Sequence, residues 1–231
     1  MVRATTVIGA GLLGLASMTS PRTERPVPFK VGETLTYDVS WSSYVTAGTA
    51  VATVESKQPS RGSLVYRIVA DGRPLPLLAY LYALHYRVDT LLDAYTLLPE
   101  RATVQIEEGA RKRQRETTFD RKAQPAAEDV LSAIYTLRAT PLATGARLSM
   151  PVVENGVTYT VHIVVGSPEA VRTPFGTATA WKVMPTALDP KGQPAGKNIA
   201  LWISTDARRL PLKIQADMPV GTFGLLLREV R

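Results

Sequence analysis

The sequence predicts an all-β protein with two short helices, in which one strongly curved antiparallel sheet forms an incomplete barrel or a sandwich. The main evidence is an alternation of apolar and polar residues that recurs along the chain, as in residues 34–41. A period of two is typical of strands with one buried face. Apolar residues recur at helical spacing in only two short segments. No internal repeat or second domain boundary is evident, so residues 29–231 are expected to form a single β-rich domain.

Residues 1–20 have the features of a secretory signal peptide. Arg3 is followed by an uncharged, mostly apolar stretch with small residues near its end. Cleavage is expected after Ala16 or a few residues later, before Pro21; an uncleaved membrane anchor and a buried strand are the alternatives. Residues 21–28 are rich in proline and are expected to be a disordered lead-in. The mature protein is therefore predicted to be periplasmic or secreted.

Composition limits the chemistry of the chain. It has a formal net charge of +7 and no cysteine, which excludes disulfides, thiolate metal sites and a lipid-modified cysteine. A basic exported protein can meet anionic lipid headgroups or acidic polymers, although scattered surface charges produce the same total. Nucleic acid is not an expected partner, because it would require the export prediction to fail.

Six strands and a short helix are expected before the central helix. Gly48, Ala50 and Ala52 share one face of the second strand and leave room for a large group to lie against it. After Pro74 or Pro76, leucines recur at helical spacing and predict the short helix. The expected strands are residues 34–41, 46–55, 64–70, 86–92, 100–107 and 113–120, and the helix is expected over residues 77–84.

The central helix and six further strands are expected in the second half. Residues 128–138 place Val130, Ile134 and Leu137 on one helical stripe. Asn155-Gly156 predicts a hairpin with a type I′ turn, since both turn residues need positive φ. A polar corner at residues 204–209 separates two alternating runs and predicts another hairpin. The expected strands are residues 152–154, 157–165, 177–184, 199–204, 211–217 and 223–230.

No constellation of catalytic or metal-binding residues is recognisable, so neither enzymatic activity nor a metal or cofactor is expected. His85 and His162 are the only histidines and lack partners at metal-ligand spacing. Glu107 and Glu108 are neighbours on a strand and project to opposite faces, so they cannot work as a pair on one bond. The turn at residues 192–197 carries a proline where a phosphate loop needs a backbone amide, and it is interpreted as an ordinary loop.

Two sets of side chains are candidates for ligand binding. Arg111, Arg113 and Arg115 would share one strand face and could hold lipid phosphates or another anionic surface. Alternatively, these charges keep an exposed sheet edge soluble. Aromatic residues on the predicted strands could line an apolar cavity, or they could simply fill the core. The candidate wall residues are Tyr37, Trp41, Tyr66 and Trp202.

Several short motifs recur in a characteristic order: residues 32–39 with Ala47-Gly48, then Leu98-Pro99, residues 129–135 with Leu137-Arg138, residues 173–176 and residues 202–211. Together they resemble a bacterial family known as domain of unknown function 3108, over nearly the whole mature chain. The resemblance implies an exported, mostly β protein of the cell envelope and supplies no catalytic residues. By a looser analogy the shape is similar to the bent sheets of lipoprotein carriers, whose concave face shelters lipid.

Three functions follow from these observations as hypotheses. The first is a periplasmic, non-enzymatic protein that binds a lipid or another amphipathic envelope molecule, with the central helix near one opening. The second is a structural or adaptor protein with a filled interior, which docks an envelope protein through a sheet edge or basic face. The third is an envelope hydrolase acting through Asp38, Asp129 or Asp206, which requires at least two of them in one cleft.

Overall fold

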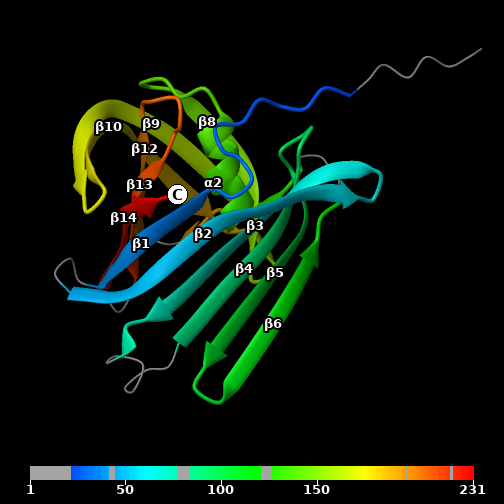
Figure 1. The fold of residues 1–231 in the computed structure, drawn as a ribbon, viewed down its shortest axis with the longest axis horizontal. Helices are drawn as coiled ribbons and strands as arrows, with labels where there is room; N and C mark the ends of the chain where they lie inside the picture. Colours follow the sequence, from blue (N-terminus) through cyan, green and yellow to red (C-terminus); the bar gives the residue numbers. More distant parts are fainter. Residues whose placement is uncertain (1–21, 42–44, 77–83, 121–125, 196, 219–220) are drawn as a thin grey trace, which may run out of the picture.

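One curved sheet makes up most of the protein (Figure 1). The computed structural model describes residues 22–41, 45–76, 84–120, 126–195, 197–218 and 221–231. Within these ranges it contains fourteen strands and the helix α2, Val130–Ala139. The strands are β1 (Thr34–Trp41), β2 (Val45–Ser60), β3 (Ser63–Pro74), β4 (Leu84–Asp93), β5 (Pro99–Glu108), β6 (Arg111–Thr118), β7 (Glu128–Asp129), β8 (Arg147–Glu154), β9 (Val157–Thr173), β10 (Gly176–Leu188), β11 (Pro194–Ala195), β12 (Lys197–Ser204), β13 (Pro211–Met218) and β14 (Gly221–Val230).

The strands follow a continuous path around the sheet. Their spatial order is β6-β5-β4-β3-β2-β1-β14-β13-β12-β10-β9-β8-β7, with β11 paired to β10. Neighbours are antiparallel, apart from the parallel pair of β7 and β8. The pairing of β1 with β14 joins the first and last strands in the middle of the sheet, with Leu35 opposite Val230. Because β6 and β7 end the order without pairing to each other, the sheet is the incomplete barrel that the alternation predicts.

The helix α2 lies inside the curve of the sheet and packs on both halves of it (Figure 1). Leu131 and Tyr135 belong to a core cluster with side chains of β2, β3 and β4. Ala133 and Leu137 belong to a second cluster with side chains of β8, β9, β10 and β12. The predicted stripe through Val130 is therefore wrong, since Val130 is 48% exposed. A helix held between two walls buries two faces, so it fills the interior.

A third core cluster lies where the far end of the β9–β10 hairpin covers β14. The amide of Phe175 donates to the carbonyl oxygen of Leu227 at 3.0 Å, and Val171 of β9 packs in one cluster with Leu227. Leu201 of β12 belongs to the helix cluster, whereas Trp202 belongs to this third cluster. Both faces of β12 are therefore buried, so this half of the sheet has a second layer, as in a sandwich.

The predicted strands are present, and several are longer than the alternation indicates. β2 continues to Ser60 and β9 continues to Thr173. The pairing of β2 with β3 shifts register between Val54 and Ser56, and such a bulge interrupts the alternation while the pairing continues. The type I′ hairpin is confirmed, with φ of 52° at Asn155 and 79° at Gly156. The short helix expected over residues 77–84 lies almost entirely outside the described residues.

The small residues of β2 do not make space for a ligand. A Cβ atom at Gly48 would stand 2.4 Å from the carbonyl oxygen of Arg73 on β3, so the neighbouring strand already occupies that space. Ala50 and Ala52 pack against the third core cluster. The large group that lies against this face is therefore the protein's own third core cluster, which contains Tyr37 and Trp202.

Residues 22–28 run along the sheet before β1 begins. The amide of Arg25 donates to the carbonyl oxygen of Ala94 at 3.0 Å, Glu24 forms an ion pair with Lys57, and Val27 packs against the first core cluster. Part of the lead-in thus has defined contacts with the domain. The predicted signal peptide lies outside the described residues.

Side-chain caps hold the polar corner between β12 and β13. Asp206 Oδ1 accepts from Ser204 Oγ at 2.7 Å and from the Arg208 amide at 3.2 Å. The carbonyl oxygens of Arg208 and Arg209 accept from the guanidinium of Arg138, at 3.2 and 3.1 Å. The corner is therefore docked on the last turn of α2.

Candidate functional site

The two ends of the sheet approach each other and leave a seam. The seam lies between β6 on one side and β7, the start of α2 and the turn after β8 on the other. Arg115 Nη1 donates to the carbonyl oxygen of Asn155 at 2.8 Å. Inside the seam, Thr90 Oγ1 donates to Asp129 Oδ1 at 3.0 Å. Side chains thus bridge the two ends where a closed barrel would have a backbone ladder.

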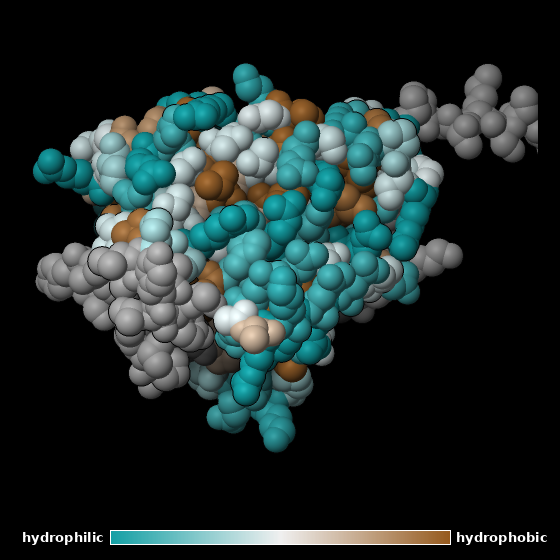
Figure 2. All heavy atoms as spheres, turned by 60° about the horizontal axis from the view of Figure 1, so that its bottom comes forward, coloured by the Kyte–Doolittle hydropathy of each residue, from teal (hydrophilic) through white to brown (hydrophobic). Residues whose placement is uncertain are grey.

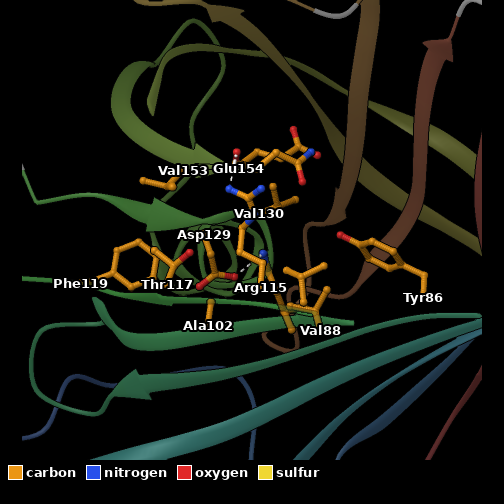
Figure 3. A pocket seen from close by; sticks show the side chains of 13 residues that line it. Tyr86, Val88, Ala102, Arg115, Thr117, Phe119, Asp129, Val130, Val153 and Glu154 are labelled. Atoms are coloured by element: carbon orange, nitrogen blue, oxygen red, sulfur yellow. Dashed lines mark hydrogen bonds between the residues drawn. The ribbon is translucent and has the colours of Figure 1, made fainter. Parts of the chain in front are cut away.

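A small pocket opens into this seam (Figure 3). Its volume is about 40 Å³, enough for about three water molecules at roughly 10–15 Å³ each. Strands β4, β5 and β6 form one wall, and β7, α2 and the end of β8 form the other. The apolar lining includes Val88, Val104, Val130 and Val153, and the polar lining includes Tyr86, Arg115, Thr117, Asp129 and Glu154.

Asp129 is the buried polar group of the pocket. It is the N-cap of α2, and its Oδ1 accepts from the amides of Leu131 and Ser132 at 2.9 and 3.2 Å. Its other oxygen, Oδ2, is buried and accepts no hydrogen bond from the residues that the structure describes. Burial raises the pKa of this carboxyl, while the hydrogen bonds from Ser132 and Thr90 oppose the rise. Oδ1 is therefore structural, whereas Oδ2 is a buried acceptor that has no hydrogen-bond partner among the described residues.

Glu128 is a second buried carboxyl, next to the pocket but not in its lining. Burial raises its pKa to about 7, with hydrogen bonds from Ser132 and Thr136 acting in the opposite direction. Glu128 and Asp129 are consecutive residues of β7, so their side chains leave the strand in opposite directions. The two carboxyls therefore do not form a catalytic pair facing one substrate.

The predicted wall residues do not line this pocket. Tyr37 is buried, and its hydroxyl donates to the carbonyl oxygen of Pro211 at 3.0 Å. Tyr66 is buried with its ring 5.3 Å from Phe29 in an edge-to-face arrangement. The side chain of Trp41 lies outside the described part of the protein. Tyr37 and Tyr66 thus take the second role considered from the sequence, that of core.

Trp202 is likewise a core residue, and polar side chains surround its ring. Its ring is 6% exposed, with the ammonium groups of Lys182 and Lys213 at 5.3 and 4.6 Å from the ring centroid. Its indole nitrogen donates to Glu169. Two cations and a hydrogen bond occupy the faces and edge of the ring, which leaves none of it for a ligand.

The basic residues of β6 behave differently from one another. Continuous pairing of β6 with β5 puts Arg111, Arg113 and Arg115 on one face, as predicted. Arg113 Nη2 is 2.6 Å from Glu108 Oε2, and Arg115 lines the pocket and reaches Asn155. The structure therefore brings one member of the predicted stripe, Arg115, to the site.

The carboxylates considered for hydrolysis do not share a cleft. Asp129 lines the pocket, whereas Asp38 is bound to Arg228 at 2.8 Å and Asp206 caps the corner after β12. His85 Nε2 lies 2.7 Å from Asp71 Oδ2 and is outside the pocket lining. No group of three or more His, Asp and Glu side chains suited to a metal ion occurs among the described residues.

The sequence contained a signal for the site that the predictions did not use. Asp129 is followed three residues later by Ser132, and the two form a reciprocal capping box in the structure. An N-cap residue with a polar partner at that spacing marks a helix start. The spacing of Asp129 and Ser132 predicts that Asp129 caps a helix that begins at Val130. In the structure, this helix start lies in the seam.

None of the helices in the described ranges has the length and hydropathy needed to cross a membrane.

A curved, unclosed antiparallel sheet with a helix inside it and a bridged seam defines a β-barrel-like class of protein. The chain belongs to the family described as "Protein of unknown function (DUF3108)", which it matches over residues 36–129 and 124–228. This confirms the resemblance drawn from the short motifs. Among curated proteins, none matches this chain.

Solved structures resemble it at low sequence identity. A β-barrel-like protein of domain of unknown function DUF1849 from Brucella abortus is 12% identical, with a TM-score of 0.55, and the match covers 87% of this chain and 97% of that one. A protein assigned as exported, with a YmcC-like fold, from Bacteroides fragilis is 11% identical, with a TM-score of 0.43 and coverage of 90% and 100%. A protein assigned as a lipoprotein from Parabacteroides distasonis is 8% identical, with a TM-score of 0.43 and the same coverage. The first of these supports the β-barrel-like fold.

Proposed function

We propose that this protein is a non-enzymatic adaptor of the cell envelope, which docks an extended, acidic segment of a partner protein along the free edge of β6. The observation that carries the proposal is a filled interior next to an open sheet edge. Helix α2 and the two core clusters around it occupy the concave side, and the described pocket in the seam is too small to enclose a lipid chain. The N-terminal sequence supports export.

Strand β6 has one edge without a strand partner among the described residues, and the turn after β8 meets this edge at Arg115. It is the last strand of the spatial order, and seven of its eight residues are exposed. The two-residue turn at Gly109-Ala110 makes Glu108 and Arg111 the first pair of the hairpin, and the amide of Phe119 donates to Glu100 of β5 at 3.1 Å. The backbone hydrogen bonds between β6 and β5 therefore involve the odd-numbered residues of β6, and the amides of Lys112, Gln114 and Glu116 point away from the sheet. An extended segment can add there as a further strand.

The charge of β6 selects an acidic partner. The strand carries four cationic side chains and one acidic one. Lys112 and Arg113 are compensated by Glu107 and Glu108 of β5. Arg111 and Arg115 have no acidic partner within the described residues, but Arg115 Nη1 donates to the carbonyl oxygen of Asn155. The charge of Arg111 in particular is therefore available to carboxylates of a docked segment. Figure 2 shows that hydrophilic residues cover much of the molecular face at this end.

The competing explanation is that the charges of β6 protect the edge from aggregation. A peptide of alternating glutamate and valine, long enough to match β6, distinguishes the two. We expect it to bind in a salt-dependent manner by fluorescence anisotropy, whereas a peptide with lysine in place of glutamate does not bind. Gln114→Pro removes one outward amide while keeping every backbone hydrogen bond to β5, so it should weaken binding about tenfold. The control Gln114→Thr keeps the amide and should bind as the wild type does. Equal binding by wild type and Gln114→Pro, or none by the acidic peptide, would overturn the adaptor function.

Binding of a small amphipathic molecule is a second candidate function. It is favoured by one specific observation, which is that Arg115 of the predicted basic stripe lines the seam pocket together with apolar side chains.

A further inference from the structure

We infer that the seam pocket is a binding site for a small molecule with an apolar body and one hydroxyl group, which hydrogen-bonds to Asp129 Oδ2. This site lies beside the edge of β6 that docks a partner in the proposed function and shares Arg115 with it, but its head-group position, Asp129, belongs to β7. It specifies the second candidate function and does not depend on peptide docking.

The head-group position is set by Asp129. This residue is 5% exposed, and Oδ2 has no hydrogen-bond partner among the described residues although Oδ1 has three. A buried carboxylate oxygen without a partner is unfavourable, so a group that satisfies it gains free energy on binding. Figure 3 shows the Asp129 side chain among the lining residues, between Thr117 and Arg115.

A hydroxyl suits this position better than a charged group. It can donate to an ionised carboxylate and accept from a protonated carboxyl, so it satisfies Oδ2 in either state. An anionic head group would be repelled by Asp129 and Glu154, and a cationic one would be attracted by them but repelled by Arg115, since all three line the pocket. A neutral head group avoids the repulsion in both cases.

The body of the ligand must be apolar and small. Val88, Val104 and Leu131 supply walls without hydrogen-bonding side chains. At the mouth, Tyr86 is 40% exposed and Val130 is 48% exposed, and apolar surface of this kind beside a recess is typical of a binding site. At about 40 Å³ the pocket holds only part of a ring, so the rest of the ligand must lie against the exposed side chains of Tyr86 and Val130.

Phenol and benzene form a matched pair of probes, because they differ in the hydroxyl alone. Titration of the full chain followed by ¹⁵N chemical shifts should move the amides of Val104, Thr117 and Val130 with both compounds, with phenol binding about tenfold more tightly. Asp129→Ser retains an N-cap oxygen for α2 and removes Oδ2. This variant should lower phenol affinity about tenfold, to the level of benzene, and leave benzene binding unchanged.

Two further variants keep the test independent of folding defects. Val104→Phe fills the pocket without touching Asp129 and should abolish the shifts from both probes. Asp189→Ser, at an exposed turn where Asp189 Oδ1 accepts two backbone amides, is the matched control and should bind as the wild type does. Equal affinity for phenol and benzene, or an unchanged phenol affinity in Asp129→Ser, would overturn the role of Oδ2. Absence of shifts with both probes would mean that the pocket holds only water. Peptide binding at β6 should be unaffected by Asp129→Ser, so failure of one proposal is distinguishable from failure of the other.

Discussion

Arg138 and Glu33 form a two-point ion pair in the interior of this protein, with Nη1 to Oε1 at 2.6 Å and Nη2 to Oε2 at 3.0 Å. Both side chains are almost completely buried. The remaining contacts of the guanidinium go to the carbonyl oxygens of the β12–β13 corner. The pair therefore joins the turn before β1, the end of α2 and that corner, which carry three of the motifs on which the resemblance to the family was based.

Loss of one partner of this pair should be strongly destabilising. Glu33→Gln leaves the Arg138 charge buried without a counter-charge, so we expect a loss of about 3–5 kcal/mol in the free energy of unfolding, measured in urea. The exposed pair of Arg231 and Glu229 provides the control, and Glu229→Gln should cost less than about 1 kcal/mol. A Glu33→Gln effect as small as that of Glu229→Gln would contradict the importance of the buried pair.

Glu128 should make the protein less stable as the pH rises from about 4.5 to 7. Its folded-state pKa of about 7 lies above the ordinary value of 4.5, so the folded state holds a proton that the unfolded state releases across this range. The free energy of unfolding falls by on the order of 3 kcal/mol, and this fall is complete above pH 7. The neighbouring Asp129 acts in the same direction, since burial raises its pKa as well.

Glu128→Gln should remove much of this pH dependence. Urea unfolding at pH 5 and pH 8 would show a smaller difference for the variant than for the wild type, with the gain in stability at pH 8. Glu229→Gln again serves as the exposed control and should retain the wild-type difference. A variant that keeps the full difference would show that other groups cause it.

Gly48→Ala should disrupt the pairing of β2 with β3. The added Cβ would meet the carbonyl oxygen of Arg73 at 2.4 Å, and this atom belongs to the backbone and cannot rotate away. We expect a loss of at least about 2 kcal/mol in thermal or urea unfolding. Gly72→Ala is the matched control on β3, because its Cβ would be 3.8 Å from the nearest atom. Similar stabilities of the two variants would contradict this close approach.

The Trp202→Ala variant tests whether Trp202 is a core residue or the wall of a cavity. As core, Trp202 should cost about 3–5 kcal/mol when it is truncated to alanine. Phe175→Ala is the comparison, since Phe175 is 37% exposed at the turn after β9, and it should cost much less. Near-equal losses, measured by urea unfolding, would favour a role for Trp202 in lining an open space.

Some features of this fold could be predicted from local patterns. The type I′ turn at Asn155-Gly156 and the polar corner at residues 204–209 depend on residues that are adjacent in sequence. The strands follow from a period of two, which each segment carries by itself. The central helix lies where it was predicted, but Val130 of its predicted buried stripe is exposed. The sequence of the helix does not specify how many walls of the sheet surround it.

The candidate site could be predicted only in part. The common face of Arg111, Arg113 and Arg115 follows from strand geometry, but the position of Arg115 opposite Asn155 depends on how far the sheet curves. Tyr66 and Trp202 alternate correctly on their strands, yet alternation cannot tell a filled core from a lined cavity. That distinction depends on what lies across from each strand.

The amino-acid sequence by itself determined the all-β class, the hairpin turns, the place of the central helix and the family. Each of these depends on neighbouring residues or on motif order. The tertiary structure alone decided that α2 fills the interior, that Arg138 pairs with Glu33 across 105 positions, and that Arg115 and Asp129 share a pocket. The physical reason is that these contacts form only when distant segments are brought together by the curvature of one sheet, and no local periodicity specifies where the two ends of that sheet meet.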